Sequence, residues 1–113
     1  MSSPIAGAWQ LVSDSEDGIM VFSDSYYSVV MSAKNRSKFK SENPTEAEAA
    51  EVFRTLTTAA GPYKLMGTTL VCGRIANKHP NWTGVDASFE ITLDGDRLTV
   101  QGGANSTVWK KVE

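Results

Sequence analysis

Apolar and polar side chains alternate along several short segments of this chain, the period expected of strands with one buried face. The clearest segment covers residues 85–93, where the odd positions are apolar and the even positions are Asp, Ser, Glu and Thr. Shorter segments rich in aromatic and β-branched residues extend the set to about eight predicted strands. These strands are residues 9–13, 19–22, 26–33, 63–66, 69–76, 85–93, 97–101 and 106–112.

Short turn sequences separate these segments. Residues 15–18 end in Gly18, which takes positive φ at little cost, and Asp94-Gly95 is a strong hairpin signal. Because parallel neighbours need long crossover connections, strands this closely spaced must run antiparallel. The pattern therefore predicts an up-and-down meander.

The segment after the third strand predicts one helix. Asn43 is a capping residue, Pro44 occupies the first helical position, and Glu46 follows three residues after the cap. Gly61-Pro62 is expected to end the helix. Between these signals, apolar residues recur at helical spacing, at Ala49, Val52, Phe53, Leu56 and Ala60.

The number and spacing of these elements indicate a barrel. The 113 residues allow one domain, residues 1–113. Gly7-Ala8-Trp9 opens the first strand and an aromatic-basic segment around Trp109 closes the last, so the two ends are expected to pair. The predicted fold is all-β: an antiparallel up-and-down eight-stranded barrel, with one helix between the third and fourth strands covering an end or flank. A barrel of eight strands has room inside for side chains or one small ligand.

Five stretches, in order along the chain, carry a family resemblance. They are residues 7–13 (GAWQLVS), 22–29 (FSDSYYSV), 60–63 (AGPY), 80–84 (PNWTG) and 95–100 (GDRLTV). In this order, with a helix in the matching place, the chain resembles the lipocalin-like domain family of small bacterial and fungal calycin proteins. The resemblance implies a calycin-type barrel with a small molecule held inside.

The chain departs from the patterns that it resembles. A histidine is common in the family on the strand before the Pro-Asn-Trp turn, and an arginine on the strand after it; the matching residues here are Cys72 and Phe89. The closing strand also resembles that of fatty-acid-binding proteins, whose carboxylate-holding Arg and Tyr are matched here by Thr107 and Trp109. The resemblance therefore implies an apolar interior pair and no carboxylate clamp on the last strand.

The composition argues against nucleic acid and membranes as partners. The net charge of −2 offers no overall attraction for nucleic acid or an anionic membrane. No apolar run approaches the ~20 residues of a membrane span. Cys72 is the one cysteine, which excludes an internal disulfide framework and suits a reducing compartment. Since the first residues lack a basic and apolar leader pattern, we expect a cytoplasmic location.

Few residues suggest catalysis. One histidine and one cysteine cannot supply a metal-ligand set, and no phosphate-binding or dinucleotide motif occurs, so we expect no metal and no cofactor. Cys72 would need His79 beside it to act as a nucleophile; the alternative is a small buried hydrophobe. Arg74 is either an inward cation that needs an anionic or polar partner, or a solvated charge.

The remaining candidates concern a cavity. Trp9 is expected to plug the closed end of the barrel. The basic residues Lys34, Arg36, Lys38 and Lys40 form either a solvated loop or a rim that attracts an anionic ligand. Tyrosines and tryptophans could line the cavity or pack in a core without a ligand. The predicted ligand-binding residues are Tyr27, Met31, Tyr63, Cys72, Arg74, Phe89 and Trp109.

Three functions follow as hypotheses. The first is binding of a small hydrophobic or amphipathic molecule inside the barrel. The second is an isomerase or cyclase in which a tyrosine or Arg74 polarises a carbonyl in a dry cavity. The third is a barrel with a filled core that acts through its surface, for instance as a homodimer.

Overall fold

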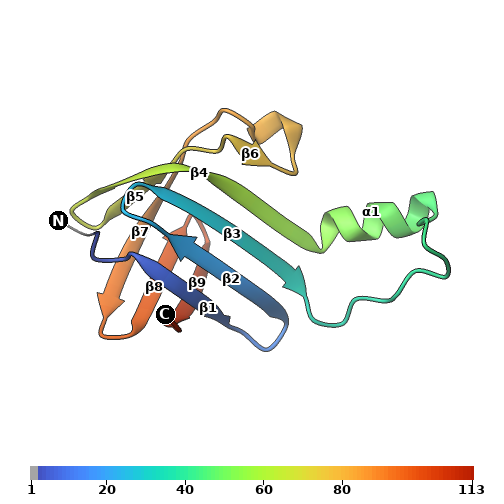
Figure 1. Ribbon diagram of the computed structural model, residues 1–113, viewed down its shortest axis with the longest axis horizontal. Coiled ribbons are helices and arrows are strands. Elements are labelled where there is room, and N and C mark those ends of the chain that lie inside the picture. The colour runs from blue at the N-terminus through green and yellow to red at the C-terminus, as the bar shows by residue number, and fades with distance from the viewer. Residues whose placement is uncertain (1–2) are drawn as a thin grey trace.

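The computed structural model describes residues 3–113 and consists mainly of antiparallel strands (Figure 1). The strands are β1 (Gly7–Val12), β2 (Glu16–Phe22), β3 (Tyr26–Ala33), β4 (Leu56–Met66), β5 (Thr69–Cys72), β6 (Ala76–Asn77), β7 (Ala87–Asp94), β8 (Arg97–Gly102) and β9 (Asn105–Lys111). One α-helix, α1 (Glu46–Arg54), and one 3-10 turn, η1 (Pro80–Trp82), complete the elements of this part of the chain.

The strands close into a barrel, as predicted. Their order is β3-β2-β1-β9-β8-β7-β5-β4, and a further pairing of β3 with β4 joins the two edges. The first and last strands pair antiparallel, with Leu11 opposite Trp109. The two-residue strand β6 continues along the edge of β4 that β5 occupies, with Asn77 opposite Ala59. The expected eight-stranded antiparallel fold, with its helix between the third and fourth strands, is confirmed.

The side chains that alternate inward fill one end of the barrel. Trp9, Leu70 and Leu98 are almost completely buried, and Ile5 packs among them from the segment before β1. The indole N–H of Trp9 donates a 2.9 Å hydrogen bond to the carbonyl oxygen of Ile5. A buried indole needs such a partner, so this bond lets a large ring sit in the core without an unpaired polar group.

The helix is shorter than predicted and begins at another residue. Its N-cap is Thr45, not Asn43: the Thr45 hydroxyl accepts the Glu48 N–H, and the Glu48 carboxylate accepts the Thr45 N–H. This reciprocal pair is a capping box. The helix ends at Arg54, and the residues predicted as its last turns, from Leu56 onward, form the first half of β4. Pairing with β3 over residues 26–32 satisfies their backbone groups instead.

Gly61-Pro62 lies inside β4 and does not stop the helix. A Cβ on Gly61 would overlap the carbonyl oxygen of Gly73, which crosses close to β4 just after β5 ends. The glycine is therefore required by a close approach between two backbones. Pro62 pairs with Tyr26 on β3, so its missing N–H is tolerated at this point of the sheet.

The helix does not cover the barrel, contrary to our expectation. Figure 1 shows α1 projecting beyond the ends of β3 and β4, and none of its residues is buried. Phe53 in its last turn remains 43% exposed. Only this last turn approaches the barrel opening, because β4 starts almost immediately after it.

Two strand boundaries also differ from the prediction. Gly18 belongs to β2 and not to a turn; it faces inward, where a Cβ would lie 3.0 Å from side-chain atoms of Leu11 and Met31. The strand predicted to run through residue 76 ends at Cys72. After Cys72 the pairing with β7 ends, but the chain stays beside β4: the Gly73 N–H donates to the carbonyl oxygen of Pro62 at 2.8 Å and the Ile75 N–H to that of Ala60 at 3.0 Å. The two residues of β6 then pair with β4.

Candidate functional site

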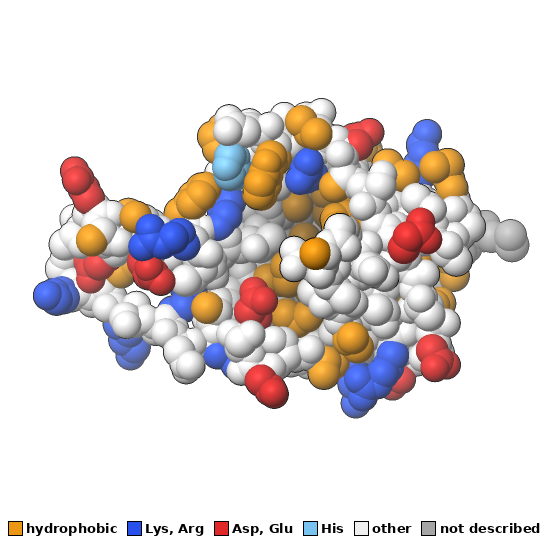
Figure 2. Space-filling view, turned by 180° about the vertical axis from the view of Figure 1, so that it is seen from behind, with side chains coloured by type: hydrophobic (Ala, Val, Ile, Leu, Met, Phe, Trp, Pro, Cys, Tyr) orange, Lys and Arg blue, Asp and Glu red, His pale blue; other side chains and the backbone are white. Residues whose placement is uncertain are grey.

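A cavity of about 730 Å³ occupies the barrel interior and opens to one side. Figure 2 shows the opening as a hollow with hydrophobic side chains inside it. The walls come from side chains of β2, β3, β5, β7, β8 and β9 that point inward, and most of them are apolar. They include Met20, Phe22, Tyr27, Val29, Met31, Leu70, Cys72, Ala87, Phe89, Val100, Thr107 and Trp109, and β4 adds Thr57, Thr58 and Ala59.

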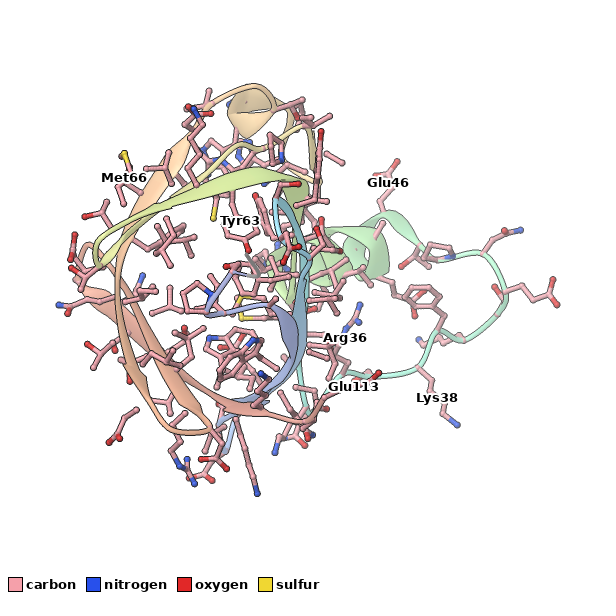
Figure 3. All side chains as sticks on the ribbon, turned by 60° about the vertical axis from the view of Figure 1, so that its left-hand side comes forward. Arg36, Lys38, Glu46, Tyr63, Met66 and Glu113 are labelled. Atoms are coloured by element: carbon pink, nitrogen blue, oxygen red, sulfur yellow. The ribbon has the colours of Figure 1, made fainter. Side chains whose placement is uncertain are left out.

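Six of the seven residues that the sequence singled out border this cavity. They are Tyr27, Met31, Cys72, Arg74, Phe89 and Trp109. Tyr63 does not: it points into the barrel (Figure 3) but packs edge-on against Phe22, with 5.0 Å between ring centroids. Its hydroxyl donates a 2.6 Å hydrogen bond to the carbonyl oxygen of Ser23. Tyr63 thus belongs to the packed end of the barrel, together with Trp9.

Two polar groups of the cavity wall already have partners within the protein. The Tyr27 hydroxyl donates to the carbonyl oxygen of Gly73 at 3.0 Å, and the Trp109 indole N–H donates to Oγ1 of Thr107 at 2.8 Å. Burial is the main cause that raises the pKa of Tyr27 to about 12, so this hydroxyl stays protonated near neutral pH. The wall therefore offers an incoming molecule shape and apolar contact more than free hydrogen-bonding groups.

Cys72 lies in the wall as a buried thiol. Burial raises its pKa to about 12, although the nearby charge of Arg74 acts in the opposite direction. No hydrogen bond joins Cys72 to His79 in the described chain; the His79 ring stacks on Trp82, and its Nδ1 accepts the Asn81 N–H at 3.3 Å. Neither feature favours a Cys-His nucleophile, because burial disfavours the thiolate and the His79 ring is engaged with Trp82 and Asn81.

The opening of the cavity, which we call the mouth, is built by η1 and the last turn of α1. A proline begins η1, and the Trp82 N–H donates to the carbonyl oxygen of His79 at 3.0 Å. This tight turn folds the Trp82 ring onto the His79 ring, with 4.3 Å between centroids and 15° between planes. Phe53 extends the group from the helix, 5.8 Å from His79. The result is a small aromatic wall at the mouth.

Two cations lie against this aromatic wall. Arg74 donates from Nε to the carbonyl oxygen of Val85 at 2.7 Å, and its guanidinium lies 5.6 Å from the Trp82 ring centroid. Lys78 donates from Nζ to the carbonyl oxygen of Phe53 and lies 4.4 Å from the centroid of that ring. Arg74 is thus half-buried at the mouth. It is neither fully inside the barrel nor a fully solvated charge, the two alternatives that the sequence left open.

Several residues of the site were not predicted. Met20 and Val29 follow from strand alternation once the inward face is known, whereas Phe53 was predicted only as part of the apolar positions of the helix. Lys78 belongs to the segment Lys78-His79-Pro80-Asn81-Trp82. The mixture of basic and aromatic residues in this segment was the sequence feature that could have indicated a binding site. None of the basic residues at 34, 36, 38 and 40 borders the cavity; all are exposed on the connection before α1. Figure 3 shows Lys38 far out on it.

Residues 3–113 form neither a metal cluster nor a membrane-spanning helix. No group of three or more His, Cys, Asp or Glu side chains there is arranged to hold a metal ion. No helix in that range has the length and apolar character required to cross a membrane.

Comparison with known proteins identifies the family. The family model for the lipocalin-like domain matches residues 13–112. Searches of curated proteins and of solved structures gave no significant match. The matched region contains strands β2 to β9, the helix and all the cavity-lining residues described above. By sequence match and by barrel architecture, the chain belongs to the lipocalin-like domain family.

Proposed function

We propose that this protein binds one small apolar or amphipathic molecule inside its barrel. The observation that carries the proposal is the cavity of about 730 Å³ with its apolar wall. Pockets that hold small molecules typically have volumes of about 300–1,000 Å³ and are lined by apolar and aromatic side chains with few polar groups. Membership of a family of small barrels supports the same function.

The binding energy would come mainly from desolvation. Removing apolar surface from water contributes roughly 25 cal/mol per Å². Since Tyr27 and Trp109 keep hydrogen bonds within the protein, an apolar ligand would leave neither group unpaired. Selectivity would then depend chiefly on size and shape. Residues 1–113 would act as one unit. The protein would work in a reducing compartment such as the cytoplasm, where Cys72 remains a free thiol.

A neutral fluorescent probe tests the proposal. N-phenyl-1-naphthylamine should bind the native protein with one site and a rise in fluorescence. Val29→Trp places a large ring in the cavity and should abolish this binding. Val30→Trp is the matched control, because Val30 is 48% exposed on the outer face of the same strand. Equal binding by both variants, or no binding to the native protein, would overturn the proposal.

Native mass spectrometry of freshly purified protein would then identify any molecule that it carries. Recovery of that molecule unchanged after incubation distinguishes binding from the isomerase or cyclase alternative. Conversion to a product would instead support catalysis in the same cavity.

A further inference from the structure

The charged side chains that border the cavity all have the same sign. They are Arg54, Arg74 and Lys78, and no Asp or Glu borders it. The chain as a whole is acidic, with 13 Asp and Glu against 11 Lys and Arg. Figure 2 shows basic side chains beside the hollow, along its upper edge. The charged residues that line the cavity are thus opposite in sign to the net charge of the molecule, although Figure 2 also shows an acidic side chain beside the lower edge of the hollow.

Two of these three cations have no carboxylate partner. Within residues 3–113 the ion pair that forms is Arg54 with Glu51, at 2.7 Å, so Arg54 already has an anionic partner. Arg74 and Lys78 have no carboxylate within 4.0 Å among the described residues. Arg74 uses Nε for the Val85 carbonyl, and its terminal amino groups make no hydrogen bond to the described protein. A guanidinium has five N–H donors and an ammonium three, so both can bind a further acceptor.

Both cations are also held in place before any ligand arrives. The Arg74 side chain is fixed by Val85 and lies over Trp82, while its own carbonyl oxygen accepts the Gly84 N–H at 2.6 Å. Lys78 is tied to the last turn of α1 through the Phe53 carbonyl. Cations fixed in this way lose little conformational freedom on binding an anion. Their arrangement is therefore suited to a ligand group that carries negative charge.

We propose that the ligand is an amphiphile with one oxyanion head group, such as a carboxylate or sulfonate. Arg74 and Lys78 bind the head group at the mouth, and the apolar body occupies the barrel. This inference rests on the proposed function and adds the chemical class of the ligand. It also accounts for the closing strand: Thr107 and Trp109 supply no cation, so charge recognition takes place at the opening and not in the interior.

A pair of probes separates charge recognition from cavity binding. N-phenyl-1-naphthylamine is neutral, and 8-anilino-1-naphthalenesulfonate has the same ring skeleton with one sulfonate added. Fluorescence titration of the native protein at low salt should give tighter binding of the sulfonate. The double variant Arg74→Gln/Lys78→Gln should weaken sulfonate binding by roughly tenfold or more, because charge-assisted hydrogen bonds are lost. Binding of the neutral probe should change by less than about threefold.

The double variant Lys34→Gln/Lys38→Gln is the matched control. It changes the net charge equally but acts on exposed side chains outside the cavity lining. If it weakens sulfonate binding as much as the mouth variant does, the effect is general attraction and the inference is overturned. The single variant Lys78→Gln serves if the double mouth variant does not fold, and it should still weaken the sulfonate selectively.

The outcomes distinguish the two proposals. If the neutral probe binds and the mouth variants leave sulfonate affinity unchanged, the head-group inference fails while the cavity-binding proposal stands. If neither probe binds the native protein, both fail. Selective loss of the sulfonate, together with competition by long-chain carboxylates but not by acetate, supports the amphiphile over a free small anion.

Discussion

The hydroxyl of Tyr27 on β3 donates a hydrogen bond of 3.0 Å to the carbonyl oxygen of Gly73, which directly follows β5. This bond passes over Gly61 of β4, which lies opposite Tyr27, and holds the peptide immediately before Arg74. The wall of the cavity and the cation at its mouth are therefore parts of one connected arrangement.

Replacing Tyr27 by phenylalanine should destabilise the fold and disturb the mouth. The substitution removes the donor and leaves a partly buried carbonyl unpaired, at a cost of about 1–2 kcal/mol in the free energy of unfolding. Thermal unfolding should show a melting temperature several degrees lower. Tyr63→Phe removes a similar bond, to Ser23, at the packed end of the barrel. Only Tyr27→Phe should also weaken binding of the sulfonate probe; an equal effect of both variants would contradict this link to Arg74.

Gly61→Ala should be strongly destabilising although glycine is replaced by the next smallest residue. The added Cβ would overlap the Gly73 carbonyl oxygen, and two sheet segments would have to separate. We expect a loss of roughly 1–3 kcal/mol in the free energy of unfolding, measured by urea denaturation. Thr57→Ala, at an exposed position of the same strand, should change stability by much less. A neutral effect of Gly61→Ala would show that the two backbones are not in close contact.

Alkaline pH should lower the free energy of unfolding, because two buried side chains have raised pKa values. Burial chiefly raises the pKa of Cys72 from 9.0 to about 12 and that of Tyr27 from 10.0 to about 12. The folded state therefore keeps protons that the unfolded state releases, and the free energy of unfolding falls as pH rises from about 9 to 12. The melting temperature should decline over this range, and less so in Cys72→Ala, which removes one of the two groups. An identical decline in both proteins would count against the buried thiol.

The thiol of Cys72 should also react slowly with iodoacetamide at pH 8. Its high pKa leaves very little thiolate, and the side chain is only 5% exposed. Mass spectrometry should show alkylation much slower than in the double variant Cys72→Ala/Ser37→Cys, whose only thiol lies on the exposed connection before α1. Comparable rates would mean that the cavity wall opens freely.

Amide hydrogen exchange should be faster in α1 than in the barrel strands. None of the nine helical residues is buried, so the helix is stabilised mainly by its own capping box and by contacts of its last turn. Amides of residues 46–54 should exchange far faster than those of β1 and β9. Thr45→Ala removes the cap and should speed this exchange further while leaving the melting temperature of the barrel nearly unchanged. Protection of α1 equal to that of the strands would contradict this.

Strand alternation and short turns were sufficient to predict the barrel and its closure. The same local signals failed around residues 55–62, because a Gly-Pro pair can either end a helix or permit a close approach between strands. The choice depends on Gly73, which lies far along the chain. β-branched residues at 55, 57 and 58 favoured the extended form.

Only part of the candidate site could be predicted from the sequence. Alternation along a strand indicates which side chains point inward, but not how deep in the barrel each one lies. Tyr27 and Tyr63 both point inward, yet only Tyr27 borders the cavity. Arg74 could not be placed by parity because the strand ends before it. The contact of Lys78 with Phe53 joins two elements whose relative position no local pattern gives.

The helix α1 is attached to the barrel at one end only. A single residue, Thr55, separates the helix from β4, and its carbonyl oxygen accepts the Ala33 N–H at 3.0 Å, so this end is anchored to the barrel rim. The other end follows a long exposed connection. A tilt of the helix about Thr55 would move its distal turns more than Phe53, which lies two residues from this anchor. A tilt of α1 would therefore change the mouth of the cavity less than it displaces the far end of the helix.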